Sequence, residues 1–174
     1  TLKIPIAIYG NLINIAANSR DNITIEYILS PVINRVTSFL QSDMGFNLNR
    51  QAIFTYTTMQ KVGLKKFTSY IHISGLVEVS VCMSFDQFLL DKLLEELNHG
   101  HKVLQEELLE YRQSVSMEVL NIIIGNALFN PYDHSILKIT SPNIIEHDEL
   151  TTEGANEKIA HVIIDTEYGE MQVL

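Results

Sequence analysis

The chain has 174 residues, and 46% of them are hydrophobic, so it can bury one substantial core and is not a disordered acidic tail. Its 21 acidic residues outnumber 12 Lys and Arg, giving a net charge of -9 without any basic cluster, which argues against a nucleic-acid partner. One cysteine, Cys82, excludes a disulfide framework and favours the cytoplasm, and the apolar runs are too short to cross a membrane.

We expect residues 1–23 to form an N-terminal extension of unclear structure, and residues 24–174 to form a single domain. The first helix of this domain should begin near Ser30, because Pro31 is well tolerated only in the first turn. Gly45 follows the last apolar position of the helix, where a glycine is a common C-cap. Residues 51–59, 67–74 and 76–85 then alternate with the period of β-strands.

The rest of the chain alternates between helical and strand-like patterns. Ser74–Gly75 predicts a tight hairpin, and residues 61–66 a solvated turn. Residues 86–97 predict an amphipathic helix, and residues 102–129 a long one. Residues 134–146 predict one or two strands broken at Pro142, 147–157 an acidic loop, and 158–174 two strands that turn at Tyr168–Gly169. The class is therefore α+β, with long helices packed on an antiparallel sheet of about six strands.

A polar stripe runs along the long predicted helix. Four residues are spaced by four, three and four positions, which places them on one side of an α-helix: Ser114, Glu118, Asn121 and Gly125. A neighbouring stripe is apolar and consists of Met117, Leu120, Ile124 and Leu128, with Ile123 beside it. Glu118 and Asn121 can therefore be exposed while the other faces of the helix are buried. The simplest explanation is the ordinary solvent face of an amphipathic helix, although Asn is a middling helix former for such a face.

The same residues resemble the signature of a known family. Ser114-x-x-x-Glu118-x-x-Asn121, followed by Gly125-Asn-Ala and then by Pro142, is similar to the motif of the CheC/CheX/FliY chemotaxis phosphatases. The interval from Asn121 to Pro142 is slightly shorter than the family's usual one. CheC-like members carry a second Glu-x-x-Asn on the first helix, whereas here Asn34 has Pro31 in place of the glutamate, so the resemblance is to CheX-like members with one site.

The resemblance implies a CheC-like fold and an activity. Such proteins accelerate hydrolysis of the aspartyl-phosphate on a CheY-like response regulator, in chemotaxis or two-component signalling. Asn121 would orient the attacking water, and Glu118 would pair with a lysine of the regulator. Ser114, Gly125 and Pro142 would line the contact surface. The resemblance implies no cofactor in this chain, Mg²⁺ in the phosphorylated partner, and a homodimer that associates through its sheets.

Three other interpretations are open at this point. A non-catalytic CheC-like binding or oligomerisation module in bacterial signalling would bind a regulator without dephosphorylating it. An unrelated structural domain would bury the polar stripe. A metal site built from His99, His101, His134 and His147 is less favoured, because the sequence places no carboxylate pair at ligand spacing.

Overall fold

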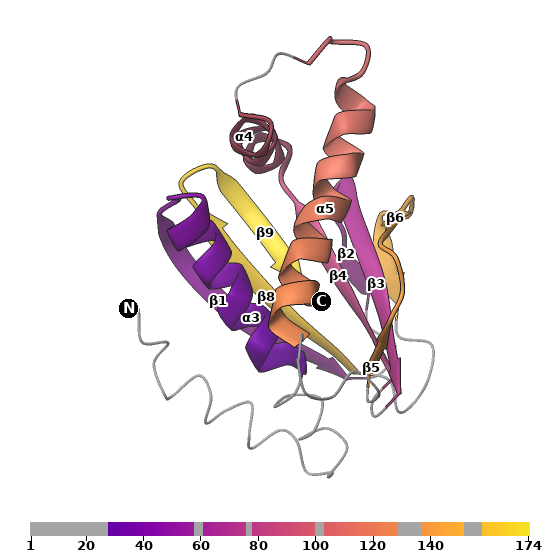
Figure 1. Ribbon diagram of the computed structural model, residues 1–174. Coiled ribbons are helices and arrows are strands. Elements are labelled where there is room, and N and C mark those ends of the chain that lie inside the picture. The colour runs from indigo at the N-terminus through magenta and orange to yellow at the C-terminus, as the bar shows by residue number, and fades with distance from the viewer. Residues whose placement is uncertain (1–27, 58–60, 76–77, 100–102, 129–136, 152–157) are drawn as a thin grey trace.

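The computed structural model describes residues 28–57, 61–75, 78–99, 103–128, 137–151 and 158–174. Within these ranges the chain forms a seven-stranded sheet with helices packed on one face (Figure 1). All of its strand pairs are antiparallel, so the predicted α+β class is confirmed. The predicted N-terminal extension lies outside the described residues, and the division at residue 23 stays a prediction.

The large sheet has the strand order β1-β8-β9-β4-β3-β5, and β6 also pairs with β3. A separate two-stranded sheet joins β2 to β7. The strands are β1 (Leu48–Thr57), β2 (Lys61–Gly63), β3 (Phe67–Gly75), β4 (Val79–Phe85), β5 (Leu137–Ile139), β6 (Asn143–Ile145), β7 (Glu149–Thr151), β8 (Lys158–Thr166) and β9 (Gly169–Val173).

The helices are α3 (Ser30–Ser38), α4 (Gln87–Leu97) and α5 (Leu108–Leu128), and a π-helical turn, η2 (Phe39–Asp43), continues α3 directly. Pro31 occupies the first turn of α3, as predicted, where its missing N–H leaves no intrahelical bond unmade. Gly45 follows with a φ of +72°, a conformation that glycine adopts without strain. No helix among the described residues is long and apolar enough to span a membrane.

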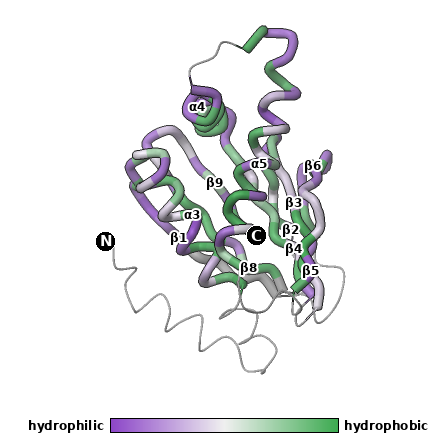
Figure 2. The backbone as a smooth tube through the Cα atoms, viewed as in Figure 1, coloured by the Kyte–Doolittle hydropathy of each residue, from purple (hydrophilic) through white to green (hydrophobic). Residues whose placement is uncertain are grey.

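The core lies between the sheet and the helices. Alternate residues of the central strands face the helices, as the period of two in the sequence requires. Figure 2 colours the backbone by residue hydropathy, and hydrophobic residues are concentrated where the helices face the sheet. The largest fully buried side chains come from both layers: Phe39, Phe85, Leu40, Ile71, Ile73, Met83, Leu89, Leu90, Leu93, Leu120, Ile123 and Ile124.

The structure differs from the sequence prediction in several loops and element boundaries. The predicted solvated turn at 61–66 begins with β2, whose Val62 is buried, and the predicted acidic loop contains its partner β7. Three-residue strands are too short to show a period of two. Gly75 belongs to β3, and β4 begins only at Val79. The long helix begins at Leu108 instead of Lys102.

A cluster of charged side chains holds the start of α4 against the sheet. Asp86 precedes α4, and its side chain does not cap the helix. Asp86 Oδ1 instead accepts a hydrogen bond from Lys65 Nζ at 2.9 Å, and Oδ2 accepts one from the Glu170 backbone N–H at 2.8 Å. Lys65 Nζ also lies 2.9 Å from Glu170 Oε1. Burial disfavours the charged form of Asp86, but these hydrogen bonds outweigh it and lower the pKa of the carboxyl below its usual value.

We predict that Asp86→Asn destabilises the protein by about 1 kcal/mol at neutral pH, because the carboxylate loses its charge-assisted hydrogen bonds. Since the folded-state pKa is lowered, the stabilisation is present above the ordinary pKa of 3.8 and is lost as the pH falls through the folded-state value. Denaturant unfolding as a function of pH should therefore show the two proteins converging at acidic pH. A constant difference down to the most acidic pH would contradict this assignment.

Candidate partner-facing site on helix α5

Helix α5 carries the candidate site and has one buried and one exposed face. It lies beside α3, above β3 and β4, and also contacts β6 (Figure 1). Four of its side chains are fully buried against these elements: Val119, Leu120, Ile123 and Ile124. The four predicted stripe residues are all exposed on the opposite face: Ser114, Glu118, Asn121 and Gly125. The stripe is therefore available to a visiting molecule.

Glu118 and Asn121 are neighbours on this exposed face. A separation of three positions on an α-helix brings their Cβ atoms to about 5–6 Å from each other. Within the described residues neither side chain makes a hydrogen bond or an ion pair. The pair therefore offers a carboxylate with two acceptor oxygens beside a carboxamide that can both donate and accept. Such an arrangement can bind a cation and position a water molecule on a partner.

Two polar contacts fix the orientation of α5 from its inner side. The Arg112 guanidinium donates from Nε to Asp91 Oδ1 at 2.6 Å and from its terminal nitrogen to Oδ2 at 2.8 Å, which joins α5 to α4. One turn later, the buried Ser69 hydroxyl of β3 donates to the Ser116 carbonyl oxygen at 2.9 Å. Sequence periodicity did not identify either contact. The Ser116 contact is made by its backbone carbonyl, while its hydroxyl donates to the Gln113 carbonyl, so the residue type at position 116 gave no signal of it.

The C-terminal end of the stripe carries Gly125, with Asn126 next to it in the sequence, and the space around Gly125 is open. A Cβ added to Gly125 would meet no atom within 4 Å, so the glycine is not required by a close contact within the described chain. Asn126 is also exposed, but its Nδ2 donates to the Ile122 carbonyl one turn earlier at 2.8 Å. The two asparagines of this helix therefore differ: Asn126 is bonded to its own helix, whereas Asn121 projects without such a bond.

Pro142 lies between β5 and β6, and it is half-buried. Pro142 directly precedes β6, a strand that contacts α5. Asn34 of α3, the counterpart of a second site, is exposed, with Pro31 at the position where a glutamate would stand. Its helix packs beside α5.

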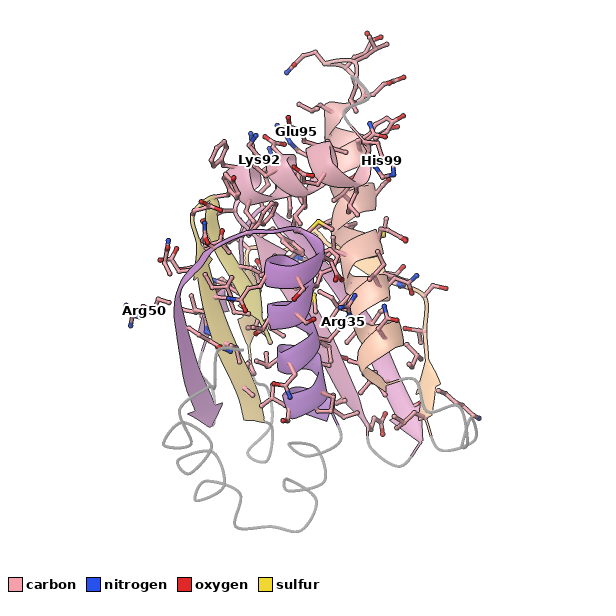
Figure 3. The ribbon with its side chains drawn as sticks, turned by 60° about the vertical axis from the view of Figure 1, so that its left-hand side comes forward. Arg35, Arg50, Lys92, Glu95 and His99 are labelled. Atoms are coloured by element: carbon pink, nitrogen blue, oxygen red, sulfur yellow. The ribbon has the colours of Figure 1, made fainter. Side chains whose placement is uncertain are left out.

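The alternative metal site gains no support from the described residues. No group of three or more His, Cys, Asp or Glu side chains in that part of the chain is arranged to hold a metal. His99 is exposed at the end of α4, and Figure 3 shows it at the level of this helix, together with Lys92 and Glu95. His101 and His134 lie outside the described residues.

This arrangement of helices and strands is the fold of CheX and CheC-like chemotaxis proteins. A protein assigned to chemotaxis from Desulfovibrio vulgaris Hildenborough superposes with a TM-score of 0.65 at 18% identity, covering 83% of this chain and 92% of its own. CheX from Desulfovibrio desulfuricans gives 0.61 at 17% identity, covering 83% and 94%. CheX in a complex with CheY, BeF₃ and Mg²⁺ from Borrelia burgdorferi gives 0.57 at 18% identity, also covering 83% and 94%.

Comparison of the amino-acid sequence alone did not find this family. No protein-family model matches the chain, and no curated protein matches it. At these identities the structural likeness shows the fold alone. The resemblance inferred from the residues around Glu118 and Asn121 thus leads to the same fold as the superpositions.

We predict that Asn121→Ala changes the free energy of unfolding by less than about 0.5 kcal/mol, because the side chain is exposed and Ala is the better helix former. Ile123→Ala, two positions away on the buried face, should cost about 2–5 kcal/mol through lost burial and a cavity. Chemical denaturation of the two variants provides the comparison. A large loss of stability in Asn121→Ala would show that the residue is structural.

Proposed function

We propose that this protein is a CheX-like phosphatase that accelerates hydrolysis of the aspartyl-phosphate on a CheY-like response regulator, acting in the cytoplasm. The observation that carries the proposal is the pair of exposed, unbonded side chains Glu118 and Asn121 on a helix held rigidly from behind. The CheC/CheX fold, and the CheX of similar structure that was solved in complex with CheY, support a CheY-like partner.

The reaction needs little from this chain. A water molecule attacks phosphorus in line, the bond between phosphorus and the aspartyl oxygen breaks, and inorganic phosphate leaves while the carboxylate is regenerated. The Asn121 carboxamide oxygen would accept a hydrogen bond from the attacking water and so orient it. Because the carboxamide is neutral, it would not repel the phosphoryl group. Glu118 would pair with a lysine of the regulator and fix the docked position. Mg²⁺ would be supplied by the regulator.

The other three residues of the proposed contact surface have less specific roles. Ser114 lies one turn before Glu118 and Gly125 one turn after Asn121, so a flat partner surface that reaches the central pair also meets both. Gly125 presents no side chain, which lets a partner backbone approach the helix closely. Pro142 would meet the regulator from the side of β6.

We predict that Asn121→Ala lowers the maximal rate of stimulated dephosphorylation about 100-fold, because the water loses its orienting group. The measurement is loss of phosphoryl label from a purified CheY-like regulator with and without the protein. The comparison is Asn126→Ala, which removes an exposed asparagine five positions along the same helix whose amide is bonded to the Ile122 carbonyl, and which should lower the rate far less than Asn121→Ala does. Glu118→Ala should chiefly raise KM, about tenfold or more, since it removes a docking contact.

The rival function is a non-catalytic binding or oligomerisation module. It would give a wild-type protein that binds the regulator without changing its dephosphorylation rate. Equal rates for the wild type and Asn121→Ala, both above the unassisted rate, would also contradict the proposed role of Asn121.

We further propose that the protein forms a homodimer through its sheet. Within the described part of the chain, β1 pairs with β8 alone and so forms one margin of the sheet. Figure 3 shows Arg50 of β1 projecting outward from this margin. An edge strand of this length presents a row of backbone donors and acceptors to a second copy. Because α5 is packed over β3 and β4, such a dimer would leave the polar stripe open.

The dimer can be tested by light scattering after size-exclusion chromatography over a range of protein concentrations. We expect a mass of twice 19.8 kDa at high concentration, with dissociation on dilution. A mass of 19.8 kDa at every concentration would contradict the proposal.

A further inference from the structure

The exposed face of α5 continues beyond the candidate site towards the N-terminal end of the helix. Tyr111 precedes Ser114 by three positions and Glu118 by seven, so its side chain leaves the helix on the same face. It lies about 10 Å from Glu118 along the helix axis. Its exposed fraction is 41%, so a large part of the side chain is open to a partner. Figure 1 shows this end of α5 rising beyond α4 and the strands.

The stripe from Ser114 to Gly125 is too small to specify a partner alone. It spans about 16 Å, whereas a specific interface buries about 800 Å² on each side and involves about 20–30 residues. A regulator seated on Glu118 and Asn121 must therefore contact residues beyond them. Within the described residues of α5, the exposed positions at the C-terminal end of the stripe are Gly125 and Asn126, which carry small groups. The N-terminal side offers an aromatic ring, the residue type that most often dominates interface energetics.

The charges around Tyr111 also restrict the partner. Glu107 and Glu110 are exposed beside it, and within the described residues no cation pairs with either of them. The Tyr111 N–H donates to the Glu107 carbonyl at 3.1 Å, so the helical geometry already includes position 107. A partner surface that packs on the ring would be favoured by basic side chains at its border.

We infer that Tyr111 is a docking and specificity residue for the response regulator, whose receiver domain would cover the ring with an apolar patch bordered by basic residues, next to its phosphorylation site. The inference takes the identity of the partner from the proposed function, but it does not depend on the proposed phosphatase reaction. Tyr111 is too far from Glu118 to reach the same phosphoryl group, so it contributes to binding and not to the reaction.

The test measures binding and turnover separately. Binding is measured with a panel of purified CheY-like receiver domains that carry BeF₃⁻ and Mg²⁺ as a stable mimic of the phosphorylated state, titrated with the wild type and variants. Turnover is measured with the same receiver domains carrying the aspartyl-phosphate. Tyr111→Ala should weaken binding about tenfold and raise KM similarly, with kcat within about twofold. Tyr111→Phe keeps the ring and should bind nearly as the wild type does. Phe88→Ala is the matched control, because Phe88 is 59% exposed on α4 and contacts Tyr168 of the β8–β9 turn.

The outcomes separate this inference from the proposed function. Unchanged binding by Tyr111→Ala, together with an inactive Asn121→Ala, would overturn the inference and leave the phosphatase standing. Tyr111-dependent binding without accelerated dephosphorylation would support the docking role and contradict catalysis. Equal weakening by Phe88→Ala would overturn the specific role of Tyr111, as would failure of every receiver domain to bind the wild type.

Discussion

The orientation of one helix decides what this molecule presents to its surroundings. The apolar side chains of α5, with Leu120 and Ile123 fully buried, can face the sheet in only one rotation of the helix. That rotation turns Glu118 and Asn121 outward. Burying either of them without a partner would cost several kcal/mol, so the hydrophobic and polar preferences of the helix agree. A rigid, outward-facing pair is thus a direct consequence of core packing.

Polar contacts restrict the helix further than apolar packing does. Apolar contacts are non-directional and allow a helix to slide or rotate slightly, whereas a bidentate arginine–carboxylate pair permits one geometry. The Arg112–Asp91 pair joins α5 to α4, and Asp86 joins the start of α4 to the sheet through the Glu170 N–H of β9. The position of Glu118 therefore depends on contacts made on the far side of its own helix. A displacement of about 1 Å there would matter for the proposed in-line reaction.

Periodicity in the sequence predicted the main elements because long helices and strands repeat their burial pattern often enough to be recognised. Helix α5, the strands β3 and β4, and the turn at Gly169 are examples. The small sheet of β2 and β7 was missed, because each strand has three residues and they pair across a long stretch of sequence. The stripe of Glu118 and Asn121 was predicted as exposed, and it is exposed. The contacts of Arg112 and Ser116 depend on which elements become neighbours, which no local pattern records.

An exposed amide can serve catalysis only if another protein supplies the rest of the active site. Asn121 lies on a convex helix surface, where water is freely exchanged and a lone carboxamide orients nothing. Docking changes this, because a partner that covers the helix excludes solvent and fixes the amide against its own phosphoryl group. The chain would then gain specificity from docking contacts and rate from one side chain. Under the proposed function, division of these tasks along a single helix would account for a reactive pair without a cavity, and contacts outside the motif would determine which regulator is recognised.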